Sequence, residues 1–332
     1  MPLSDVPLSL LDRAHALDGS TEAEDLARVL ERAERAEELG YHRFWVAEHH
    51  AVPGISGSAP AVLMAALAAR TRRLRIGSGG IMLPNHQPLV VAEQAATLEA
   101  LHPGRIDLGV GRSLGFTAAV RDALRTGKQA AARFESDLTE LLAHLSGAAP
   151  VTARPRDHAA TPVFVLATGA GVETAARAGL AVVLGGPALF REGPGGGAAV
   201  LERYRAQFRP SSWWQIPRVV VSANVAVART RAAARELLLP EARALAASRT
   251  RGEFPPLAPA EPDGLPAREQ ALVEETLTGS VHGTAPEVRE QLELLLARTG
   301  ADELLVTGGA YDVDAQAESD RRLAALFAAR PA

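Results

Sequence analysis

Short apolar segments typical of β-strands alternate with helix-length segments along the whole chain, and this alternation limits the fold more than any other feature of the sequence. The pattern is clearest between Leu74 and Gly111. A β run at Leu74–Gly77 is followed by a polar loop, a helix over Leu89–Leu101 and a second β run at Ile106–Val110. These segments form one βαβ unit whose polar loops lie at the carboxyl ends of its strands, where parallel α/β folds bind ligands.

Eight strands, with helices between them, are expected in all. The strands cover Val6–Leu11, Phe44–Ala47, Leu74–Gly77, Ile106–Val110, Pro162–Ala167, Ala181–Leu184, Arg218–Ala228 and Glu303–Val306. The helices cover Glu22–Leu39, Ala59–Arg70, Leu89–Leu101, Thr117–Arg125, Gln129–Leu145, a segment ending at Ala178, Ala198–Phe208, Thr230–Ala247, Ala267–Thr278, Ala285–Arg298 and Asp314–Ala329. This alternation predicts one α/β domain over residues 1–332, a (β/α)8 TIM barrel, with a doubly wound open sheet as the alternative.

One segment interrupts the pattern late in the chain. Residues 248–266 are rich in Pro and Gly, show no hydrophobic periodicity and are too many for an ordinary connection. We therefore expect an irregular insertion that crosses the surface or lies over the active-site mouth, where it could act as a lid.

The composition argues against several classes of function. The chain has 332 residues, 47% of them hydrophobic, and a net charge of -4 without a basic face, which argues against nucleic acid as a partner. It contains no cysteine, which excludes disulfides, thiolate metal sites and cysteine nucleophiles. No apolar stretch reaches the ~18 residues that a membrane helix needs, and the N-terminus lacks the pattern of a signal peptide. A cytoplasmic protein without a membrane partner is therefore expected.

Glu48-His49-His50 directly follows the second strand and is the sharpest candidate for chemistry. Because side chains alternate along a strand, one histidine should face the barrel mouth and the other should face the surrounding helices. A histidine with its unperturbed pKa of ~6.5 can act as an acid, a base or a donor to an anion. The alternative is that these residues only hydrogen-bond neighbouring loops. His86 and His102 share no helical face and no HxH or HExxH pattern occurs, so no metal site is predicted.

Two glycine-containing turns follow later strands. Gly109–Gly115 nearly matches the dinucleotide motif GxGxxG, but its last spacing is one residue too long and no acidic residue follows at the expected distance, so we reject a dinucleotide site. Arg112 in that turn could hold a phosphate or the edge of a flavin ring, with a surface salt bridge as the alternative. In the second turn, from Thr168 to Gly171, backbone N–H groups at a helix start suit a phosphate, although such a sequence also forms ordinary tight turns.

Taken together, these segments resemble the bacterial luciferase-like flavin-dependent monooxygenase family over nearly the whole chain. The densest similarity lies in FWVAEHHAVPG and LRIGSGGIMLPNHQPLVVAEQAATLEALHPGRIDLGVGR, and YRAQFRPSS, TGSVHGTAPEVREQL and TGADELLVTGG also match. The most similar members are single-chain enzymes of actinomycete secondary metabolism. The resemblance implies a TIM barrel that binds reduced FMN (FMNH2), or the deazaflavin F420 in some branches, at its mouth.

The resemblance also assigns catalytic residues. His49 would lie beside the flavin and assist proton transfer, and Glu48 and His50 would orient it. The pocket must be dry, because water would compete with the oxygenation. Its apolar walls would be formed by Leu11, Ile81 and Leu83.

The cofactor-binding residues follow from the same resemblance. A cis peptide bond between Gly79 and Gly80 would lie under the flavin ring, close to Met82, and Arg112 would lie near the flavin phosphate. The loop matched to the family's phosphate loop comprises Thr168, Gly169, Ala170 and Gly171. Relatives place Ser, Thr or Glu side chains in this loop, whereas here only the hydroxyl of Thr168 is present. The flavin is therefore expected to be a loosely held, diffusing co-substrate.

The implied function is that of a two-component monooxygenase. A separate flavin reductase would supply FMNH2, and the enzyme would use O2 to hydroxylate or epoxidise a small apolar or aromatic, possibly polyketide, molecule in antibiotic biosynthesis. One alternative is an F420-dependent hydride-transfer enzyme in which Arg112, Arg154 and Arg156 meet the acidic cofactor tail. Another is a non-catalytic partner barrel, as in the luciferase heterodimer. The resemblance also implies a homodimer through the Ala-rich helices after the second and third strands.

Overall fold

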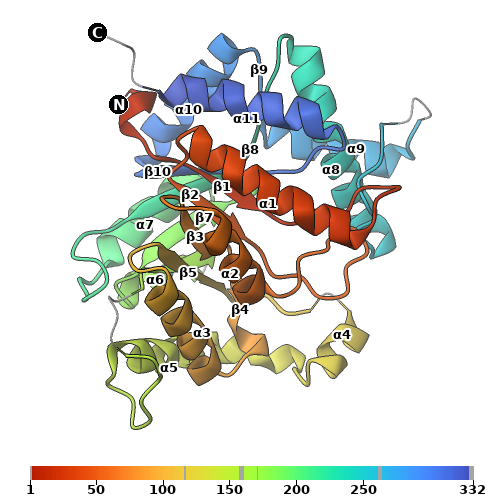
Figure 1. Cartoon of the computed structure of the whole chain (residues 1–332). Coiled ribbons are helices and arrows are strands. Elements are labelled where there is room, and N and C mark those ends of the chain that lie inside the picture. Colours follow the sequence, from red (N-terminus) through yellow and green to blue (C-terminus); the bar gives the residue numbers. More distant parts are fainter. Residues whose placement is uncertain (1, 116, 157–160, 170, 261–263, 329–332) are drawn as a thin grey trace.

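The computed structural model describes residues 2–115, 117–156, 161–169, 171–260 and 264–328. Within these residues eight parallel strands close into a barrel surrounded by helices (Figure 1), so the predicted TIM barrel is confirmed. The strand order is β10-β1-β2-β3-β5-β6-β7-β8, and the pairing of β10 with β8 closes the ring, which rules out the open sheet. The barrel strands are β1 (Leu8–Asp12), β2 (Arg43–Val46), β3 (Arg75–Ser78), β5 (Ile106–Gly111), β6 (Val163–Ala167), β7 (Ala181–Gly185), β8 (Val219–Val227) and β10 (Glu303–Thr307).

The helices connect the strands and cover the outside of the barrel (Figure 1). They are α1 (Glu22–Glu38), α2 (Pro60–Arg70), α3 (Pro88–Leu101), α4 (Ala118–Ala123), α5 (Phe134–Ser146), α6 (Gly171–Arg177), α7 (Gly197–Gln207), α8 (Arg231–Arg251), α9 (Ala267–Thr278), α10 (Ala285–Thr299) and α11 (Val313–Phe327). Short 3-10 helices occur at Leu3–Asp5, Leu83–Asn85, Lys128–Arg133 and Pro187–Phe190. Every barrel strand is therefore followed by at least one helical segment, as in other TIM barrels.

Local capping fixes where several of these helices begin. The Glu24 side chain accepts from the Thr21 backbone N–H at 2.8 Å while Thr21 accepts from the Glu24 N–H, and this capping box starts α1. Thr284 and Glu287 form the same arrangement at α10. Pro88 is the first residue of α3, where a backbone N–H would have no partner within the helix. These caps mark where loops at the carboxyl ends of strands give way to helices.

Three short elements differ from the prediction. β4 (Ile81–Met82) pairs with β5, and β9 (Val281–Gly283) pairs with β8. Both are too short to show the alternation by which a strand is recognised in a sequence. The helix expected over Gln129–Leu145 consists of a 3-10 helix, Lys128–Arg133, followed by α5.

Inward-facing side chains fill the barrel in layers, because alternate residues of a strand point to the same side. The layer at the amino-terminal ends of the strands is ionic. Arg43 donates from Nη1 to Asp107 and from Nε to Glu303, both at 2.7 Å, and both carboxylates are fully buried. The next layer is apolar and includes Leu11, Trp45, Phe164, Val183, Val220 and Leu305. Space for a ligand is therefore left at the carboxyl-terminal end.

The irregular insertion begins later than predicted. Nothing between Ser248 and Arg251 interrupts a helix, so α8 continues to Arg251 and ends at Gly252, whose φ of 79° gives a left-handed cap. The described part of the insertion packs onto the loop after β1, where the Leu257 N–H donates to the Ala16 carbonyl at 2.9 Å. The segment is thus tied to the rim of the barrel mouth.

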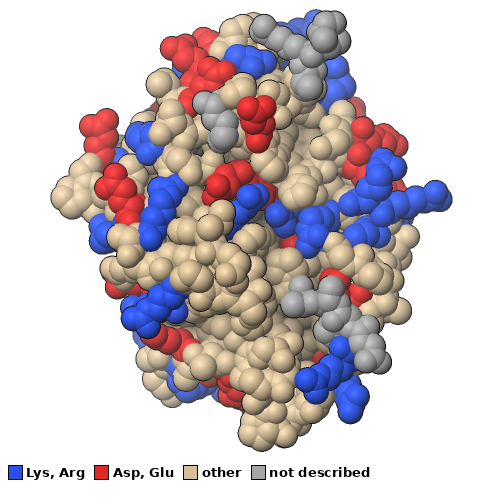
Figure 2. Space-filling model, turned by 90° about the vertical axis from the view of Figure 1, so that its left-hand side faces the viewer, with Lys and Arg blue, Asp and Glu red and all other residues tan. Residues whose placement is uncertain are grey.

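Figure 2 views the molecule from the side at which the barrel strands begin. Acidic and basic side chains are interspersed on this face. Among the described residues, no helix combines the length and apolar character needed to cross a membrane.

Candidate active site

A cavity of about 510 Å³ opens at the carboxyl ends of the barrel strands. Its floor is formed by residues at or near strand ends, which are Leu11, Ala47, Gly79, Val183, Ala223 and Thr307. Large apolar side chains on its walls are Phe134, Leu166, Phe190 and Leu245. Its polar lining includes Arg13, His49, Arg112, Thr168, Ser222, Asn224 and Arg249. The volume falls within the range of small-molecule and cofactor sites.

The Gly79–Gly80 peptide bond is cis, as the family resemblance implies. A side chain at either glycine would crowd its neighbours, which would have to shift. A Cβ at Gly79 would lie 2.5 Å from the Leu11 side chain, and a Cβ at Gly80 would lie 3.0 Å from the Gly109 carbonyl oxygen. Because glycine keeps the wall flat here, a planar ring could approach the backbone closely.

His49 lies just beyond β2 and faces the cavity. Burial, above all, lowers the pKa of its imidazole to about 3, and the positive charge of Arg13 acts in the same direction. His49 is therefore neutral at physiological pH. A neutral imidazole can accept a proton at one ring nitrogen or donate a hydrogen bond from the other.

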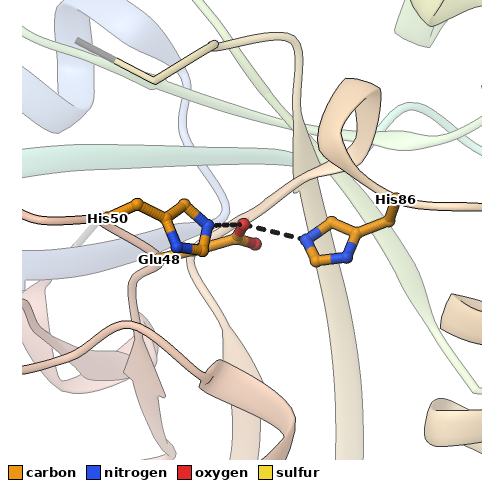
Figure 3. Close-up of side chains that lie close together, drawn as sticks. All are labelled: Glu48, His50 and His86. Carbon is orange, nitrogen blue, oxygen red and sulfur yellow. Dashed lines mark hydrogen bonds and ion pairs between the residues drawn. The ribbon is translucent and has the colours of Figure 1, made fainter. Parts of the chain in front are cut away.

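Glu48 points away from the cavity and joins two histidines (Figure 3). Its Oε1 atom accepts from His50 Nε2 at 2.6 Å and from His86 Nε2 at 2.8 Å, while Oε2 accepts from the Met82 backbone N–H at 2.9 Å. Burial opposes the charged form, but the hydrogen bonds from His86, Met82 and His50 outweigh it, so the pKa of Glu48 lies below its ordinary value. The ionised carboxylate thus links the end of β2 to β4 and to the loop that carries His86.

The sequence analysis did not group His86 with Glu48 and His50, because His86 lies 38 residues from Glu48 in a separate loop. Their possible ligand atoms lie within 4.8 Å of one another. The O···N distances of 2.6 and 2.8 Å are those of hydrogen bonds. Ligands of one metal ion at ~2.0–2.2 Å from it lie about 3 Å or more apart. A hydrogen-bonded carboxylate therefore accounts for this geometry.

The opposite wall carries the features suited to a phosphate. Arg112 follows β5, is exposed, and has no ion-pair or hydrogen-bond partner within the described ranges, so the salt bridge considered as its alternative is not formed there. Thr168 and Gly171 line the same wall after β6, Gly185 ends β7 and Gly186 follows it. This side combines a cation without a partner, a hydroxyl and glycine backbone, which are groups that bind phosphates.

Comparison with known proteins agrees with the motifs. The model of the luciferase-like monooxygenase family matches residues 8–303. The chain belongs to this family. A luciferase-like monooxygenase of Escherichia coli is 37% identical over 95% of both chains. The N-acetyl-S-alkylcysteine monooxygenase of Bacillus subtilis is 48% identical over 41% of both chains.

Solved structures also match the chain over nearly its whole length. The crystal structure of apo-MsnO8, a mensacarcin-pathway oxygenase, matches with a TM-score of 0.83 and 31% identity over 99% of this chain and 100% of that one. A 3,6-diketocamphane monooxygenase in complex with FMN (TM-score 0.70; 96% and 97% of the two chains) and an F420-dependent secondary alcohol dehydrogenase with an F420-acetone adduct (TM-score 0.66; 98% and 100%) are each 15% identical. The last two likenesses concern the fold alone.

Several predicted site residues share the cavity. They are Leu11, His49, Gly79, Arg112, Thr168 and Gly171. Gly80 and Gly169 directly follow lining residues. Glu48 and His50 lie behind the wall and do not line the cavity. Met82 does not line the cavity either, and its backbone N–H donates to Glu48. Ala170 lies outside the described residues.

Other predicted contacts with the cavity are not made. Ile81 and Leu83, expected as pocket walls, are 3% and 0% exposed and pack in the main hydrophobic core. β4 is a separate short strand, so the alternation of β3 does not continue into it. Neither Arg154 nor Arg156 lines the cavity, and Arg156 instead borders a separate pocket between α3 and α5.

Several polar lining residues were not anticipated, among them Arg13, Asn224 and Thr307. The signal for Arg13 was present in the sequence, because it lies two residues after the inward-facing Leu11 and keeps the same phase of alternation. Asn224 and Thr307 occupy inward-facing positions at the carboxyl ends of β8 and β10.

Proposed function

We propose that this protein is a flavin-dependent monooxygenase. It receives FMNH2 from a separate flavin reductase and uses O2 to oxygenate a small, largely apolar molecule by hydroxylation or epoxidation. The observation that carries this proposal is one cavity with a neutral His49, a flat glycine floor at Gly79 and the Arg112 guanidinium, which has no ion-pair partner among the described residues. Membership in the luciferase-like monooxygenase family supports the reaction class.

The residues present fit a flavin. The cavity volume suits it, Gly79 and Gly80 leave room for a ring, and Arg112 with Thr168 would hold the phosphate. When bound, reduced flavin supplies the electrons that activate O2. Thr168 is the only hydroxyl residue in the Thr168–Gly171 loop, which favours a flavin that exchanges with the reductase rather than one held permanently.

The chain's own residues would then control water and protons. Phe134, Leu166 and Phe190 exclude water from the cavity. His49 accepts or donates a proton from its neutral imidazole. Glu48 would keep the β4 segment in place beside it.

A homodimer through α2 and α3 is part of the proposal. Val62 on α2 and Val90 and Leu101 on α3 are exposed apolar side chains, which is the character of a face that a partner covers. Sedimentation of the purified protein tests this point.

The test of function is an anaerobic titration with FMNH2 and, in parallel, with reduced F420, followed by absorbance and fluorescence. We expect saturable FMNH2 binding and, after O2 is admitted with a substrate panel, incorporation of one ¹⁸O atom from labelled O2 into product. Binding of F420 alone would move the assignment to hydride transfer. If neither cofactor binds, the proposal fails and a non-catalytic barrel takes its place.

A further inference from the structure

The cavity has a second polar side that the phosphate-binding side does not explain. Arg13 follows β1, Thr307 ends β10 and Asn224 lies in β8, and these three strands are neighbours in the ring. In the ring order, β1 lies four strands from β6 and β10 lies four strands from β5. Arg13 and Thr307 are therefore across the barrel from Thr168 and Arg112.

The Arg13 side chain is held in place by a residue that does not line the cavity. Its Nη1 atom donates to Glu241 at 2.5 Å, and Glu241 is 1% exposed and is not a lining residue. Glu241 also accepts from the Gly309 backbone N–H at 3.0 Å and from Asn224 Nδ2 at 3.4 Å. The remaining N–H groups of Arg13 have no hydrogen-bond partner in the part of the chain that the structure describes. Because Arg13 lines the cavity, these groups are available to donate to a ligand there.

Thr307 gives a second, independent indication of a ligand. The residue lines the cavity and is only 6% exposed, yet its Oγ1 atom has no hydrogen-bond partner among the described residues. A buried hydroxyl without a partner is unfavourable, and a bound acceptor would remove this cost.

The charged residues that line the cavity indicate the sign of the ligand's charge. Arg13, Arg112 and Arg249 contribute to the described lining, whereas no Asp or Glu does. Arg13 is paired with Glu241 and Arg249 with Glu275, so Arg112 is the lining arginine that has no ion-pair partner among the described residues. An organic cation would find no counter-charge here, but a carboxylate would find a guanidinium and a hydroxyl on one side of the cavity.

We propose that Arg13, Asn224 and Thr307 form an oxyanion subsite that takes a carboxylate group of the organic substrate. The inference rests on the proposed function, in which an organic molecule shares the cavity with a flavin. The substrate is then an amphiphilic organic acid. Its apolar body packs against the apolar wall, and its carboxylate lies across the barrel from the flavin phosphate.

The test compares acids with their own amides. Benzoate, hexanoate and N-acetyl-S-methylcysteine are each paired with the corresponding primary amide, and dissociation constants are measured by calorimetry with and without FMN. The wild type should bind at least one acid about tenfold or more tightly than its amide, since charge-assisted hydrogen bonds are of that strength. Equal binding of every acid and its amide overturns the proposal.

Two variants locate the subsite. Arg13→Gln/Glu241→Gln removes both members of the ion pair, so that no buried charge is left alone, and it should abolish the preference for acids. Thr307→Val, which introduces no charge, should reduce that preference about threefold or more. The control is Arg70→Gln/Glu34→Gln, which removes an exposed ion pair between α2 and α1 and should preserve the preference.

The anion could instead be the flavin phosphate, and the variants distinguish the two sources. If Arg13→Gln/Glu241→Gln weakens binding of FMN but not of riboflavin, which lacks the phosphate, the subsite holds the cofactor and the assignment to the substrate is wrong. If the proposed function is wrong but the subsite exists, the result differs. The wild type would then bind acids more tightly than their amides but would not bind FMNH2.

Discussion

Glu48 Oε2 accepts a hydrogen bond from the Met82 backbone N–H at 2.9 Å, and this contact joins the end of β2 to β4, the strand that follows Gly79 and Gly80. The same carboxylate is held by His50 and His86 through its other oxygen. Two walls of the cavity therefore depend on one buried anion whose three hydrogen bonds come from different segments.

Glu48→Gln keeps the shape of the side chain but replaces one acceptor oxygen with an NH2 group. Either the Met82 N–H or the imidazoles then lose their acceptor, so the free energy of unfolding should fall by about 1–3 kcal/mol. The oxygenation rate should also fall, because the wall beside His49 loosens. Urea unfolding and steady-state turnover measure the two effects. Glu38→Gln on the exposed end of α1 is the control, and unchanged stability in Glu48→Gln would contradict this role.

His49→Ala tests the residue assigned to proton transfer. We expect coupled oxygenation to fall by about 10²–10⁴-fold, which is typical for loss of a general acid or base. The dissociation constant of FMNH2 should change by less than about threefold, since the phosphate side is untouched. Stopped-flow binding and product analysis give the two numbers. Equal losses in binding and oxygenation would show that His49 only holds the flavin.

The low pKa of His49 also predicts a pH dependence of stability. Burial lowers this pKa in the folded state to about 3 from its ordinary value of 6.5, so between these values the unfolded chain binds more protons at this residue. Stability is therefore lost as the pH falls below 6.5, with a limiting slope of about 1.4 kcal/mol per pH unit from this residue. His49→Asn should have a shallower loss of stability between pH 6.5 and 5 in urea unfolding. Parallel curves for the two proteins would refute the assignment.

The barrel could be predicted from local sequence patterns, because each strand and helix has its own periodicity of buried positions. Alternation predicted only that one of His49 and His50 faces the mouth; the family resemblance identified His49, which does line the cavity. Contacts between distant segments could not be predicted in this way, since no local periodicity indicates that His86 forms a hydrogen bond with Glu48. The expectation that Ile81 forms a pocket wall was wrong because an apolar side chain near the site can equally pack into the hydrophobic core, as Ile81 does in β4.

Arg112→Gln tests the phosphate side of the cavity. Loss of the guanidinium should weaken FMN binding by about tenfold to hundredfold, which is the range for a charge-assisted hydrogen bond. Riboflavin has no phosphate, so its binding should change little. Fluorescence titration with both ligands measures the ratio, and Arg177→Gln on α6, whose partner is the exposed Glu135, is the matched control. A loss shared equally by FMN and riboflavin would place Arg112 at the ring rather than at the phosphate.

Asp107→Asn tests whether the ionic layer supports the floor of the site. Asp107 is fully buried between Arg43, at 2.7 Å, and Arg75, at 2.6 Å, and it also accepts from Trp45 Nε1 at 3.2 Å. Removing its charge leaves Arg43 with Glu303 alone and Arg75 without a carboxylate partner among the described residues, which costs about 3–5 kcal/mol of unfolding free energy. Glu34→Gln removes an exposed partner of an arginine and should change stability little. Urea unfolding of both variants decides the question. If Asp107→Asn unfolds at the same urea concentration as Glu34→Gln, the layer fills the barrel without stabilising it.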